Sequence, residues 1–199
     1  MAFDYEIPTQ NFEKIRDAIG VILAAEFAAQ YIITSNALFQ SQIWVERFIP
    51  FDISEMPAIL IMLDSINENQ DNPGRGFYTG NYQIQAYTSG FENDSQRGDV
   101  LSSFNNHKLI GAIRYILSNP TYVRLGLNTP PLTVLGTNIS DIQFIKPNSD
   151  DGNNSVVSQL TLQVRFDENN GALTPVDFEQ VTSQVKLDET EKGYLLTLI

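Results

Sequence analysis

The stretch that most constrains the fold runs from Ser155 to Phe166, with the sequence S-V-V-S-Q-L-T-L-Q-V-R-F. From Leu160 to Phe166, apolar residues alternate strictly with polar ones. Because successive side chains of a strand point to opposite faces, this alternation predicts a β-strand with one buried and one hydrated face. The stretch is about twice as long as a typical strand, so we expect it to lie inside a sheet.

Four other regions have the composition of strands and are the expected pairing partners: 43–48, 57–63, 78–88 and 134–145. The second of them, Pro57–Leu63, is continuously apolar, which favours a strand covered on both faces. A polar loop, Asn67–Gly76, is expected to join it to the next strand. The sequence D-D-G-N-N at 150–154 is typical of a hairpin turn before the long strand.

Two segments show the three- and four-residue apolar spacing of amphipathic helices. The first covers about 11–29, with Thr9 or Asn11 as candidate caps, and the second runs from Asp94 or Ser95 to about Ser118. We therefore predict an α+β fold: a single mixed or antiparallel sheet of about four to five strands, with two amphipathic helices packed on one face. Small alanine side chains on the flank of the first helix could also allow a second helix to approach closely.

The chain is acidic, with 24 acidic and 12 basic residues and a formal net charge of −12. This balance argues against tight binding to nucleic acid or to an anionic membrane, both of which need clustered Lys and Arg. It is compatible with a protein past which DNA must move without adhering. Solubility alone is the other explanation of the charge.

The chain has no cysteine, so disulfides and cysteine-based sites are excluded. Acidic residues near the N-terminus do not fit a secretory signal. The apolar run Ala18–Ala29 is interrupted by Glu26 and falls short of the ~20 residues that a membrane helix needs. We expect a soluble protein without a targeting signal or membrane helix.

No catalytic, cofactor-binding or metal site is predicted. The single histidine, His107, has no serine and acid partners that the sequence can assign. The glycines at 74, 76 and 80 miss the dinucleotide-binding pattern and precede a strand instead of a helix. Oxygen-bearing residues at 148–154 resemble a calcium loop, but Gln159 stands where the final glutamate should be. The sequence therefore predicts no enzyme and no cofactor.

The end of the chain differs from the rest. Beyond Asp167 the periodic pattern weakens, and a charged break at 188–193 precedes an apolar terminus. We expect a domain over 1–168 and a C-terminal extension, or arm, over 169–199. Apolar side chains in this arm are candidates for contact with its own sheet or with another subunit as an added strand: Tyr194, Leu195, Leu196 and Leu198.

The order of these segments resembles that of bacteriophage tail terminator proteins, also called tail completion proteins. The similarity rests on a first helix, F-E-K-I-R-D-A-I-G-V-I-L-A-A-E-F, then M-P-A-I-L-I-M-L-D and Y-Q-I-Q-A-Y. A second helix, D-V-L-S-S-F-N-N-H-K-L-I-G-A-I-R-Y-I-L, leads into I-S-D-I-Q-F-I and S-Q-L-T-L-Q-V-R-F. The similarity covers roughly residues 10–168. It is a similarity in the pattern and order of segments, without an invariant motif.

This resemblance implies a virion structural protein made in the host cytoplasm. It would form a homohexameric ring at the head–tail junction that ends growth of the tail tube. The implied partners are the tail tube protein, possibly the sheath, and neck or connector proteins, with DNA passing through the lumen unbound. Exposed loops would contact tube or lumen, and Asp71, Arg75, Asp150 and Asp151 are the candidates. Two alternatives remain: another neck or baseplate adaptor, and a cellular α+β binding or enzymatic domain.

Overall fold

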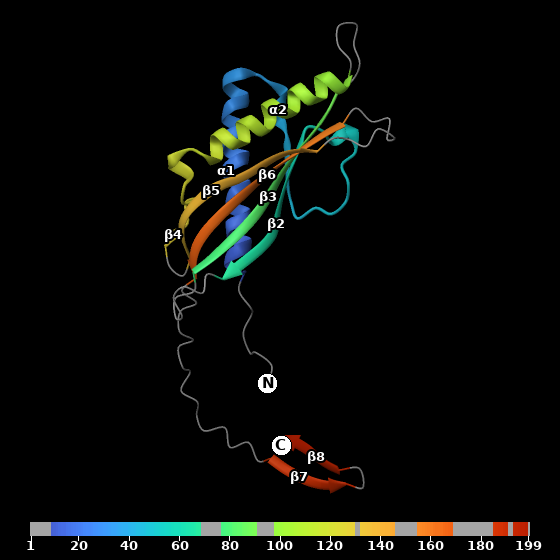
Figure 1. The fold of residues 1–199 in the computed structure, drawn as a ribbon, viewed down its shortest axis with the longest axis vertical. Coiled ribbons are helices and arrows are strands. Elements are labelled where there is room, and N and C mark those ends of the chain that lie inside the picture. Colours follow the sequence, from blue (N-terminus) through green and yellow to red (C-terminus); the bar gives the residue numbers. More distant parts are fainter. Residues whose placement is uncertain are drawn as a thin grey trace. The chain divides into compact units, whose positions relative to one another are not determined.

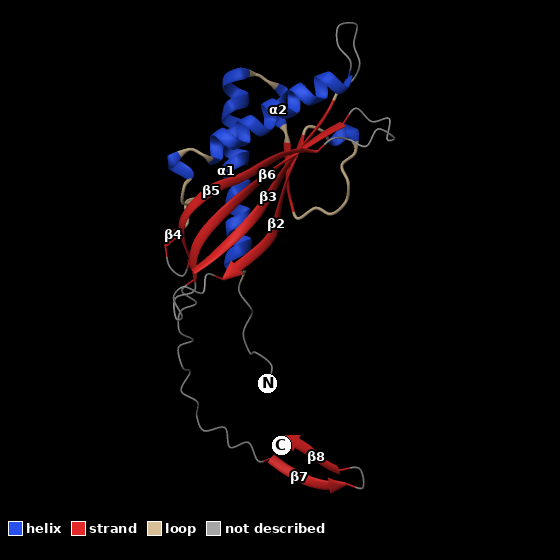
Figure 2. Cartoon of the chain, viewed as in Figure 1, coloured by secondary structure: helices blue, strands red, loops and turns tan. Residues whose placement is uncertain are grey.

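The computed structural model describes residues 9–68, 77–90, 98–129, 132–145, 155–168, 185–190 and 193–198. The chain divides into two compact units, Met1–Asn169 and Asn170–Ile199. The first unit contains a curved sheet and two long helices, and the second contains a pair of short strands (Figures 1 and 2).

The sheet of the first unit has six strands in the order β1-β2-β3-β6-β5-β4. The long strands are β2 (Ala58–Glu68), β3 (Phe77–Ser89), β5 (Leu132–Ile145) and β6 (Ser155–Glu168), and they run side by side in Figure 1. Neighbouring strands are antiparallel, except for β1 (Gln42–Val45), which runs parallel to β2. The α+β class and the interior position of β6 are confirmed.

The sheet has six strands, where the sequence predicted four to five, because β4 (Asn128–Thr129) also pairs with β5. A two-residue strand carries no periodicity that a sequence pattern could reveal. The region 134–145, predicted as one strand region, is part of β5, which begins two residues earlier at Leu132. Its register shifts between Val134 and Gly136 and again between Ile139 and Asp141. These irregularities interrupt the alternation of side chains along the strand.

The helices are α1 (Asn11–Thr34) and α2 (Gly98–Leu117), with short 3-10 turns η1 (Ala37–Gln40), η2 (Ile53–Glu55) and η3 (Pro120–Tyr122). Neither predicted cap, Thr9 nor Asn11, is the cap of α1: Gln10 is, and its backbone N–H donates to Glu13 Oε2 over 2.8 Å. The helix also continues past the predicted end at residue 29. It ends where Ser35 adopts a left-handed conformation, with φ of 52°.

Both helices contribute to one core on the same face of the sheet. The buried residues of β3 and β6 alternate in register, so that Tyr82 lies opposite Leu162 and Ile84 opposite Leu160. Apolar side chains from both helices pack against this face: Ile15, Ile19, Leu23 and Phe27 from α1, and Leu109, Ile110, Ile113, Ile116 and Leu117 from α2. The prediction that the helices cover one face is confirmed.

By length and composition, α1 could cross a membrane. Its most apolar 18-residue window has a mean hydropathy of 1.4, and 22% of that window is buried. The predicted helix was shorter, so the sequence analysis did not identify this property. The helix nevertheless supplies Ile15, Ile19 and Leu23 to the core with no exposed surface, as the core helix of a globular domain does.

Strand β1 is shorter than predicted. The chain leaves the strand at Glu46, whose φ is 51°, so Arg47 and Phe48 belong to the following loop. A glutamate rarely adopts this left-handed conformation, and a composition rich in strand formers cannot predict it. The error matters because Arg47 organises that loop.

The second unit consists of β7 (Val185–Thr190) and β8 (Gly193–Leu198), which pair antiparallel from Val185 opposite Leu198 to Thr190 opposite Gly193. The sequence pattern predicted an extended arm but not this pairing. The four apolar residues proposed for contact, Tyr194, Leu195, Leu196 and Leu198, all lie on β8. Their intersubunit role stays a prediction.

Candidate functional site

The four loop residues suggested by the resemblance lie outside the described residues. Asp71 and Arg75 fall in 69–76, and Asp150 and Asp151 in 146–154. The strands that these loops join, β2 to β3 and β5 to β6, pair antiparallel as the prediction requires. The loops' contacts with a tube or lumen stay predictions.

In the part of the chain that is described, no group of three or more His, Asp or Glu side chains could hold a metal ion. His107 is exposed on α2, and its ring lies 4.4 Å from the ring of Phe144 on β5. This contact gives the histidine a packing role between a helix and the sheet edge. The surfaces and grooves of the described residues are therefore the candidate sites.

The loop between β1 and β2 is held in shape by Arg47. Its guanidinium makes a two-pronged ion pair with Glu55, with both N–O distances 2.8 Å. It also donates to the carbonyl oxygens of Ile49 at 3.1 Å and Pro50 at 3.3 Å. The hydrogen bond from Arg47 is the main reason that the pKa of Glu55 is lowered and that of Arg47 raised. Such planar, paired contacts hold the shape of the loop more firmly than the contacts of a lysine side chain could.

Aromatic rings fix the same guanidinium from other directions. Its central carbon lies 4.7 Å from the ring of Trp44 and 4.3 Å from that of Phe51, and Phe51 packs on Tyr87 of β3 at 4.8 Å. Burial raises the pKa of Tyr87. Phe48 and Ile49, by contrast, are 84% and 72% exposed. We refer to Glu46–Met56 as the clamped loop: a fixed segment that presents two large apolar side chains to solvent.

We expect the variant Arg47→Met to loosen the clamped loop, because methionine keeps bulk but loses both bonds to Glu55. Trp44 is the only tryptophan, so its fluorescence reports this change directly. Emission should move to longer wavelength while the helical circular dichroism signal stays constant. Arg124→Met, on an exposed residue, is the control and should leave Trp44 unchanged. An unaltered Trp44 spectrum in Arg47→Met would contradict this role.

The same clamp should weaken in acid. The folded-state pKa of Glu55 is lowered, so its contribution is complete above the ordinary glutamate pKa of about 4.3 and is lost as pH falls through the folded value. Trp44 fluorescence followed against pH should therefore change below about pH 4 in the wild type. In Arg47→Met this transition should be absent, because the ion pair that protonation of Glu55 breaks has already been removed.

The face of the sheet opposite the helices carries several amide side chains on its central strands. Gln85 Nε2 donates to Gln159 Oε1 across β3 and β6 over 3.0 Å, and Gln83 Nε2 donates to Asp64 Oδ1 over 2.8 Å. Gln143 lies opposite Gln159 on the next strand. The first two pairs are hydrogen-bonded, which suits a surface in contact with water, whereas Leu60 on the same face, opposite Gln85, is buried.

One edge of the sheet lacks a neighbour over most of its length. β4 covers β5 only at Leu132 and Thr133. In the described parts of the chain, no strand pairs with the outer side of β5 from Leu135 to Ile145. Leu135 and Ile145 are also 44% and 45% exposed. Unpaired strand edges with apolar side chains are templates for added strands.

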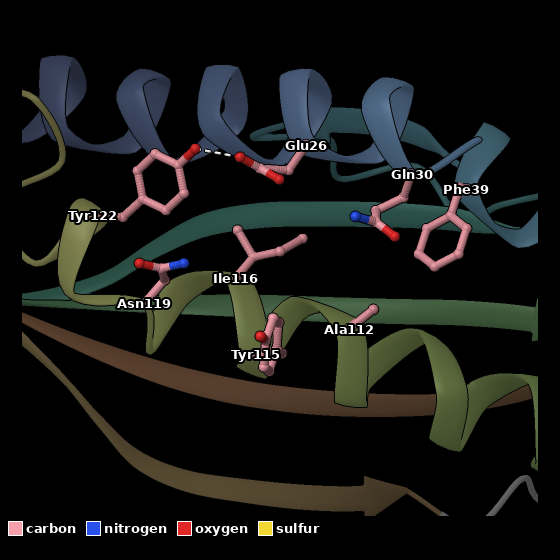
Figure 3. A pocket seen from close by; sticks show the side chains of 8 residues that line it. All are labelled: Glu26, Gln30, Phe39, Ala112, Tyr115, Ile116, Asn119 and Tyr122. Carbon is pink, nitrogen blue, oxygen red and sulfur yellow. Dashed lines mark hydrogen bonds between the residues drawn. The ribbon is translucent and has the colours of Figure 1, made fainter. Parts of the chain in front are cut away.

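A groove of about 230 Å³ lies between α1 and α2 (Figure 3). Glu26 projects into it from α1, and its carboxylate accepts a short hydrogen bond from the hydroxyl of Tyr122, which follows α2. That bond is the main cause of the raised pKa of Tyr122. Phe39 and Tyr115 line other parts of the wall.

Sequence reasoning missed the clamped loop and the groove. Arg47 and Glu55 are eight residues apart, and Glu26 and Tyr122 are ninety-six apart, so neither pair forms a local motif. The composition of residues 43–48, rich in strand formers, predicted that Arg47 lies in a strand instead. The one available signal for the groove was Glu26, an acid within an otherwise apolar helical segment. No protein-family model matches the chain, and no curated protein matches it.

Proposed function

We propose that this protein is a virion structural protein that caps a phage tail tube and ends its polymerisation, as a ring joining the tail to the head or neck. The ring is proposed to be a homohexamer, with the tube protein and neck proteins as its neighbours. The support is the resemblance in segment order together with surfaces suited to self-association. The proposal includes no catalytic step.

The observation that most supports assembly is the pair of open sheet edges. β1 forms one edge and the uncovered length of β5 the other. A closed ring requires two different surfaces on each subunit, so that one side of a copy meets the opposite side of the next. Two edges of different sequence and direction can meet this need, and the hairpin β7–β8 supplies a further strand pair for a neighbour.

The charge of the chain is compatible with the same function. A ring of this acidic protein, with a formal net charge of −12 per copy, would repel the phosphate backbone and let DNA slide through. The amide side chains on the sheet face opposite the helices form a polar surface of a kind that suits the border of such a lumen. Neither feature distinguishes a terminator from another neck ring, so the test must include tube growth.

Light scattering and negative-stain imaging of the purified protein should give a ring of about six copies. Adding this ring to polymerising tail tube protein should stop tube growth. A ring that leaves tube growth unaffected would instead favour another neck or baseplate adaptor. A monomer that neither assembles nor stops tube growth would overturn the proposal.

The open edge of β5 provides a specific variant. Ile145→Lys places a charge at the exposed edge, and lysine there opposes strand addition. We expect it to shift the mass from ring to monomer while the melting temperature changes little. Val100→Lys is the matched control, because Val100 is similarly exposed but lies on a helix, α2, which offers no strand edge. Equal masses for both variants would exclude the β5 edge from the subunit contact.

A further inference from the structure

The carboxylate of Glu26 lacks a positive partner. The ion pairs in the described residues join Arg16 to Asp17 and Glu46, and Arg47 to Glu55. The groove that contains Glu26 is lined by no lysine, arginine or histidine. Tyr122 donates one hydrogen bond, but a carboxylate has two oxygens and can accept about four. The groove therefore holds a negative charge with capacity to bind.

The walls around this charge suit a flat cation. Three aromatic side chains contribute, Phe39 from η1, Tyr115 from α2 and Tyr122 from η3, and cations are attracted to aromatic faces. Gln30 and Asn119 add amide groups on the two sides of the groove (Figure 3). Ala112 and Ile116 form an apolar floor. Carboxylate, aromatic faces and amide oxygens together can surround a group that is planar, positively charged and rich in N–H donors.

Other ligand classes fit less well. An anion would be repelled by Glu26. A divalent metal would find one carboxylate and none of the additional acidic or histidine ligands it requires. A purely apolar ligand would displace water from the carboxylate without replacing its hydrogen bonds, which is costly. An ammonium group could pair with Glu26, but it is compact and strongly hydrated, so it would use the aromatic walls poorly.

We propose that the groove between α1 and α2 binds the guanidinium group of an arginine side chain presented by a partner protein. The surroundings of the groove favour a protein over a free small molecule. Tyr115 is 78% exposed at its rim, and Ile33, one turn beyond Gln30 on α1, is 74% exposed. A charged anchor bordered by exposed apolar groups is typical of a hot spot in a protein interface. This assignment is independent of ring formation.

The probe is the peptide Ac-Gly-Arg-Gly-amide, titrated into ¹⁵N-labelled full-length protein and followed by NMR. We expect saturable shifts of backbone signals at Glu26–Gln30 and Ala112–Tyr122. The same peptide with citrulline, which is neutral and nearly the same shape, should bind about ten-fold or more weakly, because the charge-assisted hydrogen bonds are lost. Equal binding of the citrulline peptide would overturn the proposal.

Two variants locate the site. Glu26→Gln retains the shape of the side chain and a hydrogen-bond acceptor for Tyr122 but removes the charge. It should lower the affinity for the arginine peptide about ten-fold. Asp17→Asn is the matched control: it removes one acid from the same helix at a position already paired with Arg16, and it should bind as the wild type does. Equal loss in both variants would indicate general attraction to an acidic surface and contradict a built site.

Further comparisons test the walls and the source of the guanidinium. Tyr115→Ala should weaken binding several-fold, whereas Tyr115→Phe should not, since the proposed contact uses the aromatic ring and not the hydroxyl. Free L-arginine should bind more weakly than the peptide. If free arginine binds more tightly, the occupant is a small molecule and the assignment to a partner protein fails.

Discussion

Replacing Asn106 by aspartate should lower the free energy of unfolding by about 3–5 kcal/mol at neutral pH. Asn106 lies on α2 with no exposed surface, and its Nδ2 donates to the carbonyl oxygens of Ala86 at 2.8 Å and Val156 at 3.1 Å. In the variant, a carboxylate oxygen would face two carbonyl oxygens in a fully buried site. The hydrogen bonds that join α2 to β3 and β6 would become repulsive contacts.

The loss should depend on pH in a defined direction. Burial raises the pKa of a carboxyl group above the ordinary aspartate value of about 3.9. The folded variant therefore holds its proton when the unfolded chain has released it, so the variant loses stability as pH rises from about 4 until the folded pKa is passed. Urea unfolding of both proteins at several pH values measures this directly. The difference from the wild type should be smallest in acid.

The adjacent residue provides the control. Asn105 is half-buried, and Asn105→Asp should change the free energy of unfolding by no more than about 0.5 kcal/mol. If Asn106→Asp is equally mild at neutral pH, the amide of Asn106 does not anchor α2 to the sheet. This prediction matters for the proposed arginine groove, because α2 forms one of its walls.

Replacing Gly90 by alanine should destabilise the first unit by about 2–3 kcal/mol. A Cβ atom at this position would lie 2.2 Å from the carbonyl oxygen of Gly98 and 2.8 Å from the backbone nitrogen of Ser102. Both atoms belong to the backbone at the start of α2, so no side-chain rotation can relieve the overlap. The helix start would have to move away from the end of β3.

Gly111→Ala is the matched control, with the opposite sign expected. Gly111 lies in α2, and apart from its chain neighbours and the local helix backbone no atom lies within 4 Å of the position that its Cβ would take. Alanine is the better helix former, so we expect about 0.5–1 kcal/mol of stabilisation. The melting temperature should fall by about 5–10 °C for Gly90→Ala and rise by a few degrees for Gly111→Ala. A stable Gly90→Ala variant would contradict the close approach of β3 and α2.

Much of the first unit was predictable because its segments carry the signal locally. The alternation from Leu160 to Phe166 determined a strand with one buried face, and the apolar spacing in 11–29 determined a helix with one buried stripe. Strands and helices of this kind must bury those faces against one another, so the α+β class followed as well.

Boundaries set by single backbone conformations were not predictable. Strand β1 ends just before Glu46 and α1 just before Ser35, because each of these residues adopts a positive φ. Neither residue type is typical of that conformation, so the packing of the whole domain must stabilise it. The predicted strand through Phe48 was wrong for this reason, and the clamped loop was hidden by it.

By itself, then, the sequence determined the segments, the face that each one buries and the acidic character of the chain. The tertiary structure alone decided which polar groups meet: Arg47 with Glu55 and Phe51, and Glu26 with Tyr122. Hydrophobic burial needs only a repeating pattern, which short windows of sequence contain. A charge-specific contact needs two side chains at a defined distance, and only the folded chain brings residues 26 and 122 together.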